Sequence, residues 1–209
     1  MSLQTFYLAS TLLLVPGWGV LLVLLAARGR LRPLTTRDLT TLALVICLLY
    51  VVLLPFRGGL AKVPGLDALA FSIPYTVVLL LGLRLVPKPG AAASIVLGQA
   101  LLGQLLGAGL NPVMLPYHLW IALAAEGYLA LVGHRLTRLR DALTMACLRG
   151  AVAYGYSYAI LAPLVWRKHY AAWYVATKIG MGLLGCVIGA VLAQRLAPRI
   201  EEAAENPMG

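Results

Sequence analysis

Long apolar segments alternate with short polar connections along the whole chain. Seven segments of about 18–26 residues can be distinguished, the length that a helix needs to cross a hydrocarbon core of roughly 30 Å. They cover residues 6–27, 39–56, 66–86, 91–108, 114–133, 142–164 and 170–195. The pattern therefore predicts an all-α protein, a polytopic transmembrane helix bundle of about seven spans.

Turn-forming residues mark the joints between these segments. They are Pro33, Gly58-Gly59, Pro64-Gly65, Pro87-Lys88-Pro89-Gly90 and Asn111-Pro112. Asp38, Asp67 and Asp141 each stand at a predicted helix start, where a carboxylate can accept hydrogen bonds from free backbone amides. After the last segment, the acidic stretch that begins at Glu201 is expected to be a frayed, solvated end.

Composition narrows the class of protein. Of the 209 residues, 61% are hydrophobic and 11% are charged, whereas about a quarter of the residues in a soluble domain are charged. The net charge of +10 could indicate nucleic-acid binding, but that function needs a basic face on a folded domain. Here Lys and Arg form short clusters between apolar segments, which anchor and orient membrane helices. We therefore expect a multi-pass protein of the cell (plasma) membrane that contacts lipid and no nucleic acid.

The distribution of Lys and Arg over the connections predicts the orientation. Alternate connections and the tail hold eleven of them: Arg28, Arg30, Arg32, Arg37, Arg84, Lys88, Arg135, Arg138, Arg140, Arg195 and Arg199. The connections on the other side hold four: Arg57, Lys62, Arg167 and Lys168. Because basic connections stay in the cytoplasm, the N-terminus is expected outside and the C-terminus inside.

Two glycines of the last segment are candidates for close helix packing. Gly185 and Gly189 have the small-xxx-small spacing, which lets the backbones of neighbouring helices approach each other in lipid. We interpret this spacing as packing within one bundle in preference to a seam between two copies.

Aromatic residues concentrate in what the predicted orientation makes the outer half of the last three segments. An aromatic belt at the membrane interface explains Trp166 and Tyr170. It explains Tyr154 and Tyr158 less well, because both lie one to two turns below the outer surface. Tyr154 and Tyr158 share one helix face, since they are four residues apart.

A second helix face repeats this pattern and ends in a charge. Tyr170, Tyr174 and Lys178 are spaced i, i+4 and i+8, which places them on one side of a helix. If the two faces converge, they form an aromatic-walled pocket that is open to the outside and has a cation near its floor.

Two charges within the predicted spans, Glu126 and Lys178, are candidates for function, because burying a charge in a bilayer is costly. Lys178 could hold a carboxylate or a phosphate. Glu126 could hold a cationic or hydrogen-bond-donating ring. The alternative is that Glu126 and Lys178 pair with each other as a structural salt bridge.

Three further residues are candidate substrate contacts. His118 lies one turn inside the outer surface, where it is either an interfacial residue or a ligand. Asn111 lies in the turn Gly109-Leu110-Asn111-Pro112, which could cover the pocket as a lid. Trp120 belongs to the same group of aromatic residues.

Several classes of chemistry lack their residues in this chain. There is no Gly-x-Ser-x-Gly elbow, no His-Glu-x-x-His, no P-loop and no pair of carboxylates on one helix. The three cysteines are far apart, without metal-ligand spacing. We therefore predict no catalytic residue, no metal and no cofactor.

From about Thr36 to the end, the chain resembles the substrate-binding S component of energy-coupling factor (ECF) type vitamin transporters. The likeness lies in Thr35-Thr36-Arg37-Asp38-Leu39, Ser72-Ile73-Pro74, Pro89-Gly90, the Gly98/Gly103/Gly107 helix, Asn111-Pro112 and the Gly-rich final helix. It implies an extra transmembrane helix with a basic cytoplasmic loop (1–35), a six-helix substrate-binding core (36–197) and a cytoplasmic tail (198–209).

The chain also departs from this family. Some members that are specific for cobalt or nickel carry a seventh helix, but their N-terminal Met-His motif is absent here, which argues against a metal. The first core helix of the family offers an Ala-xxx-Ala face to its coupling subunit, and here Ala43 and Cys47 approximate that face.

The resemblance implies a subunit that is not an enzyme and captures a vitamin or vitamin precursor from outside. Its partners would be a transmembrane coupling subunit and two cytoplasmic ATPases, and it would topple in the membrane to release its cargo inside. In this family, thiamine-like ligands are held by aromatics and a carboxylate, whereas biotin-like ligands need a cation. Because the chain offers both Glu126 and Lys178, the substrate stays open.

Two other functions stay open as well. A small membrane enzyme could use Glu126, His118 and Lys178 in acid–base work on a lipid-linked substrate. A structural membrane subunit would only pair its buried charges.

Overall fold

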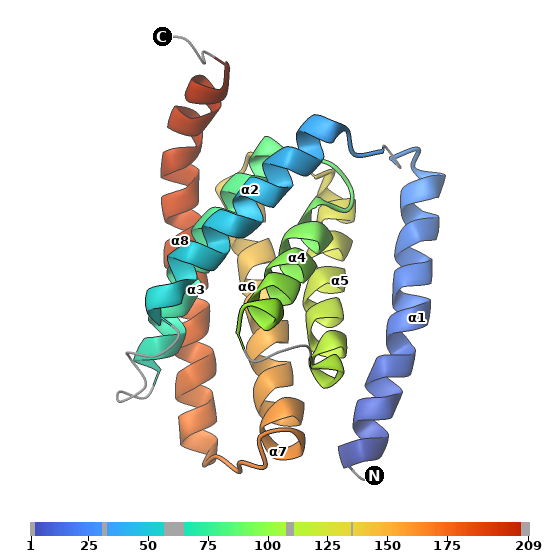
Figure 1. Cartoon of the computed structure of the whole chain (residues 1–209), viewed down its shortest axis with the longest axis vertical. Coiled ribbons are helices and arrows are strands. Elements are labelled where there is room, and N and C mark those ends of the chain that lie inside the picture. Colours follow the sequence, from blue (N-terminus) through green and yellow to red (C-terminus); the bar gives the residue numbers. More distant parts are fainter. Residues whose placement is uncertain (1–2, 31–32, 57–64, 108–110, 135, 206–209) are drawn as a thin grey trace.

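The computed structural model, drawn in Figure 1, describes residues 3–30, 33–56, 65–107, 111–134 and 136–205. The regular elements of these residues are all helical. Several sequence predictions lie outside the described residues: the joint at Gly58-Gly59, the turn residues Gly109 and Leu110, and the basic residues Arg32, Arg57, Lys62 and Arg135.

The helices follow the predicted segments in number and order, which confirms the all-α bundle. They are α1 (Leu3–Ala27), α2 (Thr36–Leu53), α3 (Leu66–Leu85), α4 (Ala91–Leu105), α5 (Leu115–Val132), α6 (Leu139–Tyr156), the short α7 (Ala162–Leu164) and α8 (Ala172–Glu205). A π-helical turn, η3 (Ser157–Leu161), joins α6 to α7, so these two form one continuous segment. Two 3-10 turns, η1 (Leu54–Phe56) and η2 (Pro112–Met114), follow α2 and precede α5.

Most of these helices are long and apolar enough to span a membrane. Within the described residues, five stretches are long and apolar enough to do so: Tyr7–Ala27, Thr36–Phe56, Leu66–Leu85, Pro112–Val132 and Ala172–Ile200. α4 is apolar but has only 15 residues, and α6 carries several charged side chains. The protein is therefore a multi-pass membrane protein.

The last helix is longer than the sequence predicted. The segment was expected to end near residue 195 and to give way to a tail from residue 198, but α8 continues through Pro198 to Glu205. The apolar pattern ends earlier than the helix because Ala and Glu, which dominate these last turns, favour helix, while the repeated Glu residues interrupt the apolar pattern.

α3 and α8 lie side by side on the side of the bundle opposite α1 and share its most extensive contact (Figure 1). α6 packs against α8, α5 packs against α6 and α4, and α2 packs against α3 and α4. The core between them is apolar and includes the buried side chains of Leu49, Leu79, Ile95, Leu129 and Met145. α1 stands at the edge of the bundle and contacts mainly α5.

Glycines on α8 make the close approach to α3 possible. A Cβ atom at Gly185 would lie 2.7 Å from the carbonyl oxygen of Leu69, and one at Gly189 would lie 2.7 Å from that of Ile73. Neither space can hold a larger residue unless the backbones move apart. The small-xxx-small spacing thus serves packing inside the bundle, as the sequence predicted.

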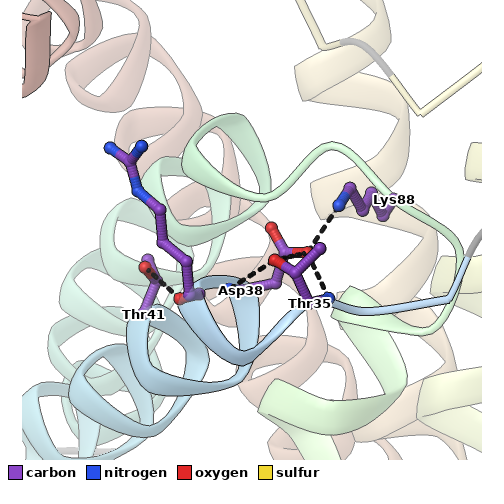
Figure 2. A network of polar contacts seen from close by, with 5 residues as sticks. Thr35, Asp38, Thr41 and Lys88 are labelled. Carbon is purple, nitrogen blue, oxygen red and sulfur yellow. Dashed lines mark hydrogen bonds and ion pairs between the residues drawn. The ribbon is translucent and has the colours of Figure 1, made fainter.

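The start of α2 is fixed by a capping box, shown in Figure 2. The backbone N–H of Asp38 donates to Thr35 Oγ1 at 3.3 Å, and the backbone N–H of Thr35 donates to Asp38 Oδ2 at 2.7 Å. Lys88, in the connection between α3 and α4, donates to the same carboxylate at 2.5 Å. The predicted role of Asp38 at a helix start is confirmed, and the carboxylate also ties α2 to the α3–α4 connection.

Two ends of the bundle are distinguished below. The α7 end carries α7, η2 and the beginning of α3 (Figure 1). The opposite end carries the described residues of three connections: 28–30, 86–90 and 136–138.

Candidate functional site

Lys178 is one of the most buried charged residues, with 4% of its surface exposed. Its ammonium group donates to both carboxylate oxygens of Asp67, at the beginning of α3. It also lies 5.3 Å from the ring centroid of Tyr174. The carboxylate that neutralises Lys178 therefore comes from α3, and the alternative in which Lys178 pairs with Glu126 is wrong.

Glu126 serves a different part of the bundle. It is 1% exposed, and its Oε1 accepts a hydrogen bond from the backbone N–H of Ala93, in the first turn of α4, at 3.0 Å. Its Oε2 lies 3.5 Å from Nε2 of His134. A carboxylate at this place stabilises the free amides and the positive dipole end of α4.

Glu126 and Lys178 are consequently far apart. Lys178 is bonded to the beginning of α3, whereas Glu126 is bonded to the helix that starts just after α3 ends. They are separated by roughly the length of α3, about 30 Å for 20 residues. An acid–base site that combines Glu126, His118 and Lys178 is therefore not assembled.

Three tyrosine rings meet at the α7 end beside Lys178. Tyr170 and Tyr174 stack with centroids 4.9 Å apart and planes 13° apart. Tyr158, in η3, contacts both edge-on, with centroid distances of 5.7 Å to Tyr170 and 6.5 Å to Tyr174. The two helix faces identified in the sequence do lie together here, and their role in substrate binding stays a prediction.

Tyr154 lies one layer further from the α7 end. Its hydroxyl lies 2.6 Å from Oγ of Ser72 and donates to the carbonyl oxygen of Ala68 at 3.1 Å. Its ring rests on Gly182, where a Cβ atom would lie only 2.2 Å from the ring carbon Cε2. Tyr154 thus links α6 to both α3 and α8 through polar and close contacts.

The structure adds a charge that the sequence reasoning missed. Arg149, in α6, is 4% exposed; one Nη donates to Cys186 Sγ at 3.2 Å. The guanidinium carbon lies 4.3 Å from the ring centroid of Tyr75. Its Nε finds no hydrogen-bond partner among the described residues. An arginine near the centre of a membrane helix costs about 2.5–3.5 kcal/mol in insertion measurements.

Arg149 could have been found in the sequence. It lies well inside the predicted span 142–164, so it is a charge at membrane depth in addition to Glu126 and Lys178. The surrounding contacts to Tyr75 and Cys186 depend on helix packing and could not be predicted from spacing alone.

These groups form one continuous feature, which we call the polar seam. It runs between α3, α6 and α8 from the α7 end toward the middle of the bundle. Its successive layers are the three tyrosines, the Lys178–Asp67 pair, the Tyr154–Ser72 pair, and Arg149 with Tyr75 and Cys186. On α8, the contributing positions 174, 178, 182 and 186 recur every four residues, which keeps neighbouring positions on adjoining parts of one helix face. Tyr170 was predicted on the same helix face but lies just before α8 begins at Ala172.

The other three sequence candidates lie outside the polar seam. Asn111 is exposed and accepts from the backbone N–H of Val113 at 3.1 Å, which caps η2. Trp120 donates its indole N–H to the carbonyl oxygen of Ser10 at 3.1 Å and so holds α1. His118 packs against the ring of Tyr117 with a centroid distance of 4.7 Å. Their predicted role as substrate contacts stays untested.

Two cavities of about 430 Å³ each lie beside α1, away from the polar seam. One is mainly apolar and is lined by Trp18, Leu21, Pro89 and Glu126 among others. The other is lined by Arg28, Arg30, Lys88 and His134 among others, at the opposite end. These cavities are consistent with the marginal position of α1, whose contacts are mainly with α5.

Comparison with known proteins adds information about the fold. No protein-family model matches the chain, and no curated protein matches it in sequence. A solved structure described as the crystal structure of an S-component of ECF transporter is similar, with a TM-score of 0.60 and 16% sequence identity. The similarity covers 84% of this chain and 90% of that chain. The helix bundle described here therefore has the fold of an ECF transporter S component.

Proposed function

We propose that this protein is the membrane-embedded substrate-capture subunit of an ECF-type importer, and that it binds a vitamin or vitamin precursor from the external side. The observation that carries the proposal is the polar seam within a bundle of the S-component fold. Charged side chains are costly at membrane depth and mark substrate or ion pathways.

The direction of capture is inferred from charge. The opposite end carries described basic residues such as Arg28, Arg30 and Lys88, and basic connections remain in the cytoplasm. The α7 end, with the tyrosines and Lys178, then faces outside. This assignment places the C-terminus in the cytoplasm and the N-terminus outside.

The substrate class follows from which charges are available. The resemblance left thiamine-like and biotin-like ligands open because the chain has both Glu126 and Lys178. Glu126 is engaged by α4 and His134, far from the tyrosines, so it is a poor candidate for holding a cationic ring. The polar seam favours the biotin-like class, whose carboxylate needs a cation.

α2 offers a surface for the coupling subunit. Ala43 and Cys47 are exposed on this helix, and so are the large apolar side chains of Leu44, Leu48 and Val51. Small residues surrounded by apolar ones allow close helix packing in lipid. In the proposed complex, this α2 face contacts a transmembrane coupling subunit, which joins the protein to two ATPases.

Co-purification from the native membrane tests the proposal. A tagged protein should retain a transmembrane coupling subunit and two ATPases, identified by mass spectrometry. Ala43→Trp and Cys47→Trp should reduce this recovery, whereas Leu139→Trp, at an exposed position on α6, should not. Recovery of the tagged protein without any ATPase would contradict the proposal.

A further inference from the structure

The chain has seven Asp and Glu residues, and all seven lie on helices of the described residues. Four lie in the bundle, and each faces a basic side chain: Asp38 faces Lys88, Asp67 faces Lys178, Glu126 faces His134, and Asp141 faces Arg140. The other three are Glu201, Glu202 and Glu205, in the last turns of α8. No carboxylate remains for a further cation in the bundle.

Among the almost fully buried charged side chains of the described residues, Arg149 is the cation that faces no carboxylate. Its bonded partner Cys186 lies 15 residues before Glu201 on the same helix, which is about 22 Å of helix. The terminal glutamates are therefore too far away to neutralise it. An arginine stays protonated in proteins, so burial cannot remove its charge.

The contacts that Arg149 does make leave its charge uncompensated. Cys186 offers a weak sulfur acceptor, and the face of Tyr75 offers a cation–π contact. Neither carries a full negative charge, and Nε keeps a free donor among the described residues. A guanidinium with open donors is suited to bind a carboxylate or phosphate.

We infer that the substrate is an organic anion whose carboxylate or phosphate is neutralised by Arg149. This inference rests on the proposed function, because it assigns the missing counter-charge to the cargo. Lys178 is not an equivalent anchor, since Asp67 already balances its charge.

The polar seam also defines the route of entry. An anion that enters at the α7 end first meets the three tyrosines and then a charge-neutral ion pair. Tyr154 closes the next layer through its bonds to Ser72 and Ala68. On this route, Tyr154 stands between the ion pair and Arg149.

Binding of matched ligand pairs tests the charge requirement. The purified full chain in lipid nanodiscs is titrated with biotin, nicotinate and pantothenate, and with their uncharged counterparts biotinamide, nicotinamide and panthenol. At least one acid should bind, and its uncharged counterpart should bind about 100-fold more weakly or not at all. Equal binding of an acid and its counterpart, or no binding of any acid, would overturn the inference.

Variants at position 149 identify the group that holds the anion. Arg149→Gln should lose about 100-fold in affinity for the acid, and Arg149→Lys should retain part of it. Lys168→Met, which removes an exposed charge at the α7 end, is the control and should bind normally. Unchanged affinity in Arg149→Gln would show that another group holds the anion.

Thermal denaturation without ligand separates this role from a structural one. A cation kept for cargo is unfavourable in the empty bundle, so Arg149→Met should be at least as stable as wild type. Clear destabilisation of Arg149→Met would overturn the inference. A second result would also overturn the inference: Cys186→Ala is destabilised, and the double variant Arg149→Met/Cys186→Ala is not. Cys186 would then act as a thiolate that neutralises Arg149.

The inference and the proposed function can fail separately. Co-purification of ATPases with the tagged protein does not depend on Arg149. If no ATPase is recovered, the proposal of an importer subunit is refuted, and the result says nothing about anion binding. Conversely, recovery of the complex together with capture of uncharged ligands only would leave the importer in place and refute the anionic substrate.

Discussion

Lys178 of α8 and Asp67 of α3 form an ion pair at the α7 end of the bundle, with Lys178 almost fully buried. The pair joins the two helices that share the most extensive contact in the fold. Because Asp67 neutralises Lys178, this ion pair also leaves Arg149 as the cation of the polar seam that is free to bind an anionic ligand.

Breaking this pair from either side should destabilise the bundle. Lys178→Met or Asp67→Asn leaves an unpaired polar group and should cost about 1–3 kcal/mol, measured by thermal or chemical denaturation in detergent. The double variant should lose less than the sum of the two single losses. Additive losses would mean that the two side chains do not interact.

Gly189 should tolerate no side chain. Its Cβ position lies 2.7 Å from a backbone oxygen of α3, so Gly189→Ala should force the helices apart and cost about 1–3 kcal/mol. Gly180 on the same helix has open space around its Cβ position, so Gly180→Ala is the matched control and should be neutral or stabilising. Similar melting temperatures for the two variants would contradict the packing described here.

Glu126→Gln should affect folding and leave capture intact. The substitution removes a carboxylate that accepts from the first turn of α4 and should cost about 1–2 kcal/mol. Because Glu126 lies far from the polar seam, affinity for a bound acid should stay within about twofold of wild type, which is well below the 1.4 kcal/mol of a tenfold change. A large loss of affinity at unchanged stability would place Glu126 in the binding site after all.

Removal of residues 1–33 should leave a folded core, because this cut spares Thr35, the N-cap residue of α2. α1 contacts mainly α5 and is held by a few hydrogen bonds, such as those from Trp120 to Ser10 and from Arg28 to Ala130. The shortened protein should remain monodisperse in detergent and retain the coupling subunit. Aggregation of this variant would show that α1 is an integral part of the bundle.

Much of the fold could be predicted from the sequence because lipid imposes a simple rule: a spanning segment must be long, apolar and helical. Helix number, order and approximate limits follow from that rule alone. The packing role of Gly185 and Gly189 could also be predicted, since small residues at this spacing allow membrane helices to approach each other closely.

The partners of the buried charges could not be predicted from the sequence in the same way. Helical spacing placed Tyr170, Tyr174 and Lys178 on one face, but it could not show that α3 supplies Asp67 opposite that face. The surroundings of Glu126 could not be predicted for the same reason, because nothing in its own helix reveals that the start of α4 lies beside it. Arg149 was visible as a charge in an apolar segment and was overlooked.

The length of α8 has a mechanical consequence. A helix of 34 residues is about 51 Å long, whereas the hydrocarbon layer is about 30 Å thick, so roughly 20 Å of it can project from the lipid. The projecting part, which contains Pro198, belongs to the same helix as Lys178, Gly182 and Cys186. A partner protein that pushes on the projecting end of α8 would therefore also shift the part of α8 that lines the polar seam.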